Sequence, residues 1–252
     1  MSTPKQTIIG LTGPAGCGKN TVADLLTKHL GFAQYAFADP LRNEVAAAFN
    51  VDASLLTDRH TKEQPTPALA LSMCADHNFV DAALSCQPTA NGQDWFEQKA
   101  APRSPRQIMQ WWGTEYRRNR HFPDYWTRKL TSRIYVRQQG GQQLHVITDV
   151  RFPNEAETIE RLGGQIWQIT RPGYGAEGDH ASATTGSNLR PRVVIDNSND
   201  QQYLQSMVLG AYFRQLAGIT SSDLVYMGMS HVSLANVEWS NGTPVPTLMA
   251  AT

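Results

Sequence analysis

Apolar residues near the start of the chain follow the pattern of a buried strand, a glycine loop and an amphipathic helix. Residues 7–12 form a short apolar run that ends at glycine and proline, as is typical of a buried parallel strand. Over residues 19–30 the apolar side chains recur at helical spacing, and Gly31 follows where a left-handed C-terminal cap is expected. The pattern therefore predicts a central strand, a loop at 13–18 and a helix, in that order.

The same alternation of strands and helices continues along the chain. Residues 34–37 are predicted to form a second strand, after which Asp39 and Pro40 suit the cap and the first turn of an amphipathic helix. Beyond the middle of the chain, the pattern predicts strands at 144–149, 165–170 and 193–196, and helices at 153–162 and about 200–216. Five strands interleaved with helices predict an α/β fold with a doubly wound, mostly parallel five-stranded sheet.

The middle of the chain is interpreted as an insertion in this core. From about residue 57 to 105 prolines interrupt the pattern, and one helix is predicted around 68–84. A clearer helix begins near Pro105, with an apolar stripe that includes Trp112 and a polar stripe suited to a ligand. We expect the chain to divide into a core of 1–56 and 143–217, a helical insertion at 57–142, a lid segment at 171–190 and a C-terminal extension at 218–252.

Composition excludes some classes of protein. The 22 Lys and Arg residues balance 22 Asp and Glu residues, so the chain lacks the cationic excess of a general nucleic-acid binder, and any phosphate is expected to be held locally. The chain has 252 residues, of which 40% are apolar, and this is enough to bury a core. Since the sequence has no apolar run of about 18 residues and no apolar leader, we expect a cytoplasmic chain without a membrane partner. The three cysteines lack metal-site spacing and are expected to be reduced thiols.

The segment Gly13–Lys19 matches the phosphate-loop pattern GxxxxGK and lies between a predicted strand and a predicted helix. Glycines let consecutive backbone N–H groups turn toward an anion, the helix N-terminus adds partial positive charge, and Lys19 can bridge the outer phosphates. The motif in this context predicts binding of a nucleoside triphosphate. The expected nucleotide contacts in the loop are Gly13, Ala15, Gly16, Cys17, Gly18, Lys19, Asn20 and Thr21.

The residues after the lysine bear on a magnesium site. The pattern calls for Ser or Thr directly after Lys19, to place a hydroxyl on Mg²⁺, whereas this chain has Asn20 and then Thr21. Asn20 could offer a carbonyl oxygen or hold a metal-bound water, and Thr21 could bond the α-phosphate. Asp149, at the carboxyl end of a predicted strand, suits a second acidic anchor, although it also suits a helix or turn cap. The predicted Mg²⁺ ligands, direct or through water, are thus Asn20, Thr21 and Asp149.

Several arginines indicate what kind of nucleotide protein this is. Phosphoryl transfer spreads negative charge over oxygens that the protein must neutralise, so small-molecule kinases need converging cations. Any single exposed arginine is often only a solvated surface residue. Several here follow predicted strands, where open α/β sheets bind ligands. The candidates are Arg42, Arg106, Arg118, Arg151 and Arg171.

Four segments together resemble the phage-type deoxynucleoside monophosphate kinases. They are Gly13–Thr21, Phe37–Arg42, Pro105–Gln107 with Gly113–Glu115, and Asp149–Glu155, and the likeness runs from about Ile8 to Leu216. The resemblance implies a three-layer P-loop NTPase fold with a helical insertion that binds the nucleoside monophosphate. It also implies transfer of the γ-phosphoryl of ATP to a deoxynucleoside 5′-monophosphate, with Mg²⁺, for DNA precursor supply in the cytoplasm of a bacterium infected by a bacteriophage.

The same resemblance implies roles for individual residues. Lys19, Arg151 and Arg171 would act in catalysis. The lid segment would begin at Arg171 and run through Gly178, and Asn197 would lie near the adenine of ATP. The predicted substrate contacts are Asp39, Arg42, Arg106, Gln107, Trp112, Glu115, Arg118, Asp149, Arg151, Asn154 and Glu155.

Simpler structural roles stay open for some of these residues. Asp39 also suits a helix cap, Trp112 a core position, and Glu115 and Glu155 suit solvated faces or contacts that orient arginines.

Two other functions also stay open. One is a P-loop kinase resembling dephospho-coenzyme A kinase, which phosphorylates a hydroxyl. The other is a nucleotide-switched binding protein, although the chain has neither an Asn-Lys-x-Asp guanine reader nor an Asp-x-x-Gly switch after the Asp149 strand. The accepted base and the presence of a homodimer stay open as well.

Overall fold

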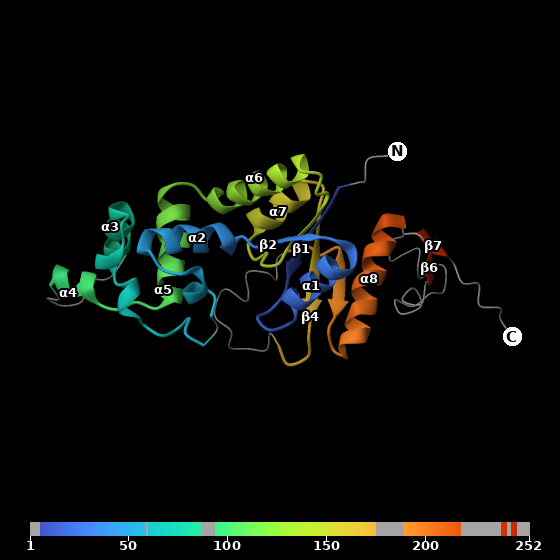
Figure 1. Cartoon of the computed structure of the whole chain (residues 1–252), viewed down its shortest axis with the longest axis horizontal. Helices are drawn as coiled ribbons and strands as arrows, with labels where there is room; N and C mark the ends of the chain where they lie inside the picture. The colour runs from blue at the N-terminus through green and yellow to red at the C-terminus, as the bar shows by residue number, and fades with distance from the viewer. Residues whose placement is uncertain are drawn as a thin grey trace. The chain divides into compact units, whose positions relative to one another are not determined.

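The structure is a computed structural model, and it divides the chain into two compact units, Met1–Gln34 with Gln142–Thr252, and Tyr35–Gly141. Figure 1 shows the strands and helices of both units. The structure describes residues 6–58, 60–86, 94–174, 189–217, 238–240 and 243–245.

The predicted five-stranded sheet is confirmed in the first unit. Its strands, in the order β2-β3-β1-β4-β5, are β1 Thr7–Thr12, β2 Ala33–Tyr35, β3 Leu144–Ile147, β4 Gln165–Thr170 and β5 Val193–Asp196. The central strand β1 is buried along its whole length and pairs in parallel with β3 and β4, and β4 pairs in parallel with β5. The carboxyl ends of these strands therefore lie at one edge, where the glycine loop follows β1.

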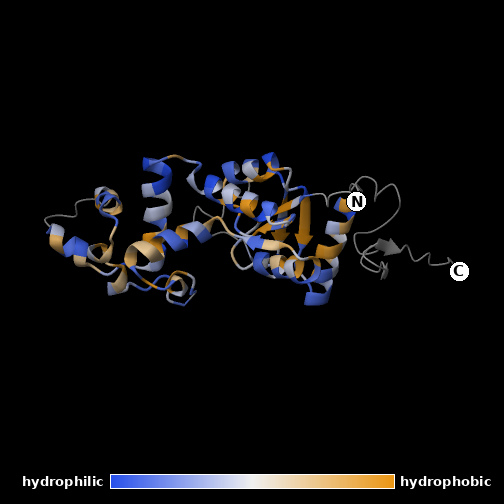
Figure 2. Cartoon of the chain, turned by 45° about the horizontal axis from the view of Figure 1, so that its top comes forward, coloured by the Kyte–Doolittle hydropathy of each residue, from blue (hydrophilic) through white to orange (hydrophobic). Residues whose placement is uncertain are grey.

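Helices cover both faces of the sheet, so the predicted three layers are confirmed. Helices α1 (Lys19–Leu30) and α8 (Gln201–Ala217) pack on one face, over a core to which alternate residues of the strands contribute. Helix α7 (Pro153–Arg161) lies on the other face, where Gly10 leaves room for the side chain of Ile159. Figure 2 shows the strands of this sheet largely in the hydrophobic colour.

The second unit is helical. Helix α2 packs against α5, α6 and the π-helix η4, around a core of aromatic side chains that includes Phe49, Phe79 and Trp112. Its helices are α2 Ala38–Phe49, η1 Ala53–Leu56, η2 Pro67–Leu69, η3 Leu71–Met73, α3 His77–Ser85, α4 Trp95–Ala100, α5 Pro105–Gln110, η4 Trp111–Arg118 and α6 Tyr125–Gln139.

The single helix predicted at 68–84 is wrong. Two short 3₁₀ turns precede α3, and the extended backbone of Ala70 and Cys74 separates them from each other and from the helix. Asp76 then caps α3, because its carboxylate accepts a hydrogen bond of 3.1 Å from the backbone N–H of Phe79. Most apolar residues of this stretch are buried, although Met73 is 57% exposed, and they belong to three short elements.

Other boundaries differ in smaller ways. The sequence analysis placed residues up to 56 in the core, but helix α2 lies in the second unit. It belongs there because it packs on the other helices of the insertion. The helix that begins at Pro105 changes to a π-helix at Trp111, and β2 and β3 end earlier than predicted, at Tyr35 and Ile147.

The predicted lid and C-terminal extension are described only in part. Residues 175–188 of the lid lie outside the described residues, and so do most residues after 217. Within the extension, β6 (Glu238–Ser240) and β7 (Thr243–Val245) pair antiparallel. Among the helices in the described part of the chain, none combines the length and apolar content that crossing a bilayer requires.

Candidate active site

Three glycines give the loop after β1 its backbone shape. Gly13, Gly16 and Gly18 have φ angles of 137°, 78° and 106°, which glycine adopts readily and other residues rarely adopt. A Cβ atom on Gly13 would also collide with the carbonyl oxygen of Ile169 and would lie 2.9 Å from the Cys17 sulfur. Gly18 is the N-cap of α1, so the loop leads directly into a helix N-terminus. This conformation fits an anionic ligand such as a phosphate group.

The side chain of Lys19 folds back over this loop. Its Nζ donates hydrogen bonds of 2.7 Å to the carbonyl oxygens of Gly13 and Pro14. Burial lowers the pKa of Lys19, and the positive charge of Arg151 lowers it further, whereas Asp149 acts in the opposite direction. The structure therefore brings three of the predicted residues within electrostatic reach of one another.

The remaining loop residues divide into buried and exposed side chains. Cys17 is 0% exposed and belongs to the core beneath the loop, and burial raises the pKa of its thiol. Ala15 in the loop, and Asn20 and Thr21 in the first turn of α1, are exposed. A ligand in the loop would meet the backbone of Cys17, while the polar groups of Asn20 and Thr21 are accessible.

Asp149 follows β3 at the carboxyl edge of the sheet. The backbone N–H of the next residue, Val150, donates a 3.1 Å hydrogen bond to the carbonyl of Leu11, so this segment runs beside the end of β1. The Asp149 side chain is partly exposed. Its predicted place near the phosphate loop thus agrees with the geometry, whereas its contact with a metal ion stays a prediction.

Glu155 supports the turn that carries Arg151. Its side chain is 2% exposed, and Oε2 accepts hydrogen bonds of 2.9 Å and 3.1 Å from the backbone N–H groups of Arg151 and Phe152. This carboxylate caps the N-terminus of α7. Arg151 itself is exposed, and Asn154 lies in the first turn of the same helix. The geometry thus gives Glu155 a structural role, and its predicted substrate contact is not needed to explain its burial.

Asn197, directly after β5, forms a hydrogen bond with the backbone of the phosphate loop. Its Nδ2 donates a 2.8 Å hydrogen bond to the carbonyl of Cys17, and its backbone N–H donates one of 2.8 Å to the carbonyl of Thr170. The side-chain amide therefore lies against the loop backbone. Its predicted contact with a donor base stays a prediction.

The residues expected to hold Mg²⁺ suit an ion that is shared with phosphates. No group of three or more His, Cys, Asp or Glu side chains in the described ranges is arranged to hold a metal. Mg²⁺ commonly takes one or two protein ligands, with waters and substrate phosphates completing the octahedron. The accessible side chains of Asn20 and Thr21, and Asp149 at the neighbouring strand end, fit such a partial set.

In the second unit, Asp39 is the centre of a small ionic cluster. Helix α2 begins at Ala38, so Asp39 lies in its first turn, and Oδ2 accepts a 2.9 Å hydrogen bond from the backbone N–H of Ala36. Arg42 approaches the carboxylate at 3.1 Å and Arg133 of α6 at 3.4 Å. The side chains of Asp39 and Arg42 remain about one-third exposed, at 32% and 31%. The cluster therefore leaves both accessible to a ligand.

Arg106 and Gln107 lie in the first turn of α5. Arg106 is exposed and forms a 2.8 Å ion pair with Glu63. The backbone N–H of Gln107 donates a 3.2 Å hydrogen bond to the Ser104 hydroxyl, which caps the helix. The cap fixes this turn, and the side chains of both predicted residues are at least partly exposed.

The π-helix η4 carries three more predicted residues. Trp112 is 1% exposed and packs on Phe79 with ring centroids 4.5 Å apart, so it lies in the core and not on a surface where a base could stack. Glu115 and Arg118 are partly exposed, and Glu115 accepts a 2.9 Å hydrogen bond from Asn119. Insertions of π-helix geometry are frequent at functional sites.

Glu44 joins α2 to η4 and α6, and the sequence did not indicate it. Its carboxylate accepts hydrogen bonds from Trp112 Nε1 at 3.0 Å, Arg117 Nε at 2.8 Å and the Tyr125 hydroxyl at 2.7 Å. Burial alone would raise the pKa of Glu44, but these three hydrogen bonds hold it below its ordinary value. The partners lie 68 to 81 residues away along the chain. The one local signal in the sequence is that Glu44 is a charged residue next to the apolar Val45, which is buried.

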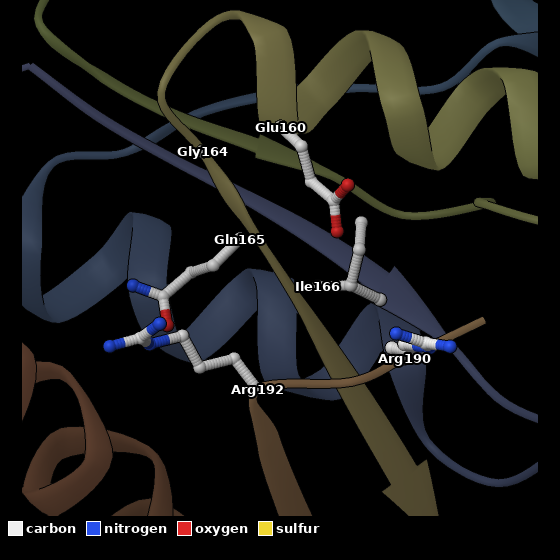
Figure 3. Close-up of a pocket in the computed structure, with 6 residues that line it drawn as sticks. All are labelled: Glu160, Gly164, Gln165, Ile166, Arg190 and Arg192. Carbon is white, nitrogen blue, oxygen red and sulfur yellow. The ribbon is translucent and has the colours of Figure 1, made fainter. Parts of the chain in front are cut away.

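A separate pocket lies away from the loop. Its volume is about 390 Å³, and it lies at the amino end of β4, whereas the phosphate loop follows the carboxyl end of β1 (Figure 3). Its lining residues are Glu160, Gly164, Gln165, Ile166, Arg190 and Arg192. Ligands of open α/β sheets bind at the carboxyl ends of the strands, so this pocket is not part of the candidate active site.

Comparison with known proteins identifies the family. The family model described as "Deoxynucleotide monophosphate kinase" matches residues 64–208. The chain belongs to the deoxynucleotide monophosphate kinase family. A curated relative from Acanthamoeba polyphaga mimivirus, with the printed name "Putative deoxynucleotide monophosphate kinase", is 27% identical over 212 residues, which cover 80% of this chain and 94% of the relative. A solved structure of dephospho-CoA kinase from Campylobacter jejuni aligns with a TM-score of 0.43 and 13% identity, and the alignment covers 84% of this chain and 97% of that chain.

Membership of the deoxynucleotide monophosphate kinase family makes the chain a kinase with a small-molecule substrate. The family match includes most of the second unit and the strand ends that carry Asp149, Arg151 and Asn197. The phosphate loop and Asp39 precede the matched region. Their assignment rests on the geometry of the loop and of the cluster around Asp39.

Proposed function

We propose that this kinase transfers the γ-phosphoryl group of ATP to a deoxynucleoside 5′-monophosphate, giving ADP and a deoxynucleoside diphosphate for DNA synthesis. The observation that carries the proposal is the loop before α1, in which three glycines with positive φ and the half-buried Lys19 have the arrangement expected of a phosphate site. This loop belongs to a chain of the deoxynucleotide monophosphate kinase family.

The first unit would bind the phosphates of the donor. The backbone N–H groups of the loop and the N-terminus of α1 attract negative charge. Lys19 Nζ, which bonds the carbonyls of Gly13 and Pro14, would exchange these acceptors for phosphate oxygens. Asn20, Thr21 and Asp149 would hold Mg²⁺, directly or through water. The ion, when bound, neutralises charge on the β- and γ-phosphates.

Cations would then stabilise the group in transfer. Arg151 lies near Lys19 and is held by the capped turn of α7, and Arg171 follows β4. Because the acceptor is already an anionic phosphate, the reaction needs no strong general base. Catalysis would consist of positioning and charge neutralisation.

The second unit would bind the monophosphate. Two arginines would supply positive charge for the phosphate of the monophosphate. One is Arg42, which shares the carboxylate of Asp39 with Arg133, and the other is the exposed Arg106. Gln107, Glu115 and Arg118 offer partly exposed polar groups for the base and the sugar.

An assay of the full chain with ATP and Mg²⁺ tests this function. We expect ADP to form in the presence of dAMP, dCMP, dGMP or dTMP, with the matching diphosphate as second product. Ribonucleoside monophosphates and dephospho-CoA serve as alternative acceptors. The variant Lys19→Ala should lose about two or more orders of magnitude in kcat because it lacks the cation that bridges the outer phosphates, with an unchanged circular dichroism spectrum. Phosphorylation of dephospho-CoA alone, or a fully active Lys19→Ala variant, would refute the proposal.

A further inference from the structure

A tight turn after β4 places two side chains next to the phosphate loop. The residues Arg171-Pro172-Gly173-Tyr174 follow the last residue of the strand, and the backbone N–H of Tyr174 donates a 3.2 Å hydrogen bond to the carbonyl of Arg171. Gly173 has a φ angle of 79°. A type II turn needs a residue with positive φ, usually glycine, at its third position and commonly has proline at its second. The sequence therefore fixes the conformation of this turn.

The turn brings the ring of Tyr174 onto the loop. A Cβ atom added to Gly16 would lie 2.5 Å from Cε1 and 2.8 Å from Cδ1 of this ring, so the ring edge contacts the loop backbone where Gly16 has no side chain. Tyr174 is nevertheless 45% exposed. The ring of Tyr174 is not part of the hydrophobic core of this unit, to which Cys17 of the loop belongs. Packing of the core therefore does not explain why an exposed ring lies against the loop.

The same ring holds the side chain of Arg171. The guanidinium carbon lies 4.9 Å from the ring centroid, within the range of a cation–π contact. Within the described part of the chain, no carboxylate forms an ion pair with Arg171. The guanidinium is thus located by an uncharged ring, which leaves its hydrogen-bond donors for an anion.

We propose that Tyr174 is a positioning residue for phosphoryl transfer, whose ring holds the Arg171 guanidinium beside the phosphate loop. The inference rests on the proposed function, in which Arg171 neutralises charge on the transferred group. A long arginine side chain has many rotamers in solution, and its ordering costs free energy when it must meet a transition state. The stack on Tyr174 provides that order before the substrates bind. Because the aromatic ring makes the contact, phenylalanine at position 174 should keep Arg171 in place, whereas an aliphatic side chain should not.

Steady-state kinetics of the full chain with ATP, Mg²⁺ and the preferred deoxynucleoside monophosphate tests the role of the ring. We expect Tyr174→Leu to lower kcat about tenfold, with a smaller change in KM for ATP, because loose positioning of a transition-state cation costs rate. Tyr174→Phe should restore the rate. Tyr135→Leu, at a tyrosine of α6 that is 60% exposed, is the matched control and should equal the wild type. In an Arg171→Ala background, Tyr174→Leu should have no further effect.

The order of the arginine side chain gives a readout that does not depend on activity. We expect the ¹⁵N relaxation of Arg171 Nε, assigned with Arg171→Lys, to show an ordered side chain in the wild type and in Tyr174→Phe, and a mobile one in Tyr174→Leu. A wild-type chain that phosphorylates no deoxynucleoside monophosphate would refute the proposed function, and the relaxation data would still test the stack. Equal order of Arg171 in all three proteins, or an equal loss of rate from Tyr174→Leu with and without Arg171, would overturn the inference.

Discussion

Glu44 links helix α2 to side chains of both η4 and α6. Its carboxylate meets an indole, a guanidinium and a phenol, and Lys129 approaches it at 3.4 Å. The pKa of Glu44 lies below its ordinary value of 4.5. A carboxyl whose pKa is lowered on folding stabilises the fold above its unfolded pKa, and this contribution is lost as the pH falls through the folded pKa.

We therefore expect Glu44→Gln to lower the free energy of unfolding at pH 7 by about 1–3 kcal/mol, because the variant leaves Arg117 without a carboxylate in a half-buried site. The difference from the wild type should shrink as the pH falls from the ordinary value of 4.5 through the lower pKa that Glu44 has in the folded protein, where its carboxylate becomes protonated. Denaturant unfolding at several pH values measures both effects. Asp81→Asn, at an exposed residue of α3, is the control and should change little. A constant difference from pH 7 to acid would contradict the role of the charge.

Local chemistry decides which residues the sequence could reveal. The shape of the phosphate loop and the position of Lys19 follow from glycine spacing, and the positive φ angles at Gly13, Gly16 and Gly18 agree with it. The apolar stripe of its helix already left a core position open for Trp112, but the hydrogen bonds of Glu44 reach partners 68 to 81 residues away and could not be predicted from neighbouring residues. Tyr174 was missed because its contact with the loop requires the fold to bring the end of β4 beside Gly16.

The elements of the first unit were largely predictable. Strand β1 and helix α1 have the predicted bounds, and Gly31 ends the helix with a φ angle of 76°. Each of these elements is defined by apolar periodicity together with a glycine at its end. The second unit contains short elements, some of them with side-chain caps such as Asp76. Apolar periodicity does not detect the breaks between such elements, so it predicted one helix at 68–84 where the structure has three elements.

The contact between α2 and the π-helix η4 leads to a prediction about Gly113. A Cβ atom on Gly113 would lie 3.1 Å from a methyl carbon of Leu41, and the Gly113 carbonyl accepts a 3.0 Å hydrogen bond from Trp126 Nε1. We expect Gly113→Val to lower the free energy of unfolding by about 1–3 kcal/mol, because the larger side chain forces the two elements apart. The same shift should raise KM for the monophosphate more than KM for ATP.

Gly210 offers a control for the loss of a helical glycine. It lies in α8, where an added Cβ atom would meet nothing within 4 Å. Gly210→Ala should therefore leave stability equal or raise it by about 0.5–1 kcal/mol, through helix propensity alone. Thermal and denaturant unfolding compare the two variants. A Gly113→Val protein as stable as the wild type would contradict close packing of α2 on η4.

Taken as a whole, the molecule separates the predicted binding tasks between two compact units. The phosphate loop, Asp149 and Arg151 belong to the first unit, and Asp39 and Arg106 belong to the second. The α/β class follows from the alternation of strands and helices along the chain. The division into units places α2 with the insertion, which sequence patterns could not reveal, because a helix after a strand suits either unit.

Binding of a triphosphate by the loop at 13–19 is the property on which the proposed function depends. A crystal structure of the full chain with Mg²⁺ and a non-hydrolysable ATP analogue measures this directly. We predict that the β- and γ-phosphates lie against the loop N–H groups, and that Lys19 Nζ leaves the carbonyls of Gly13 and Pro14 to bond phosphate oxygens. A loop without an anion, or an analogue bound elsewhere while Lys19 keeps both carbonyl contacts, would contradict the account.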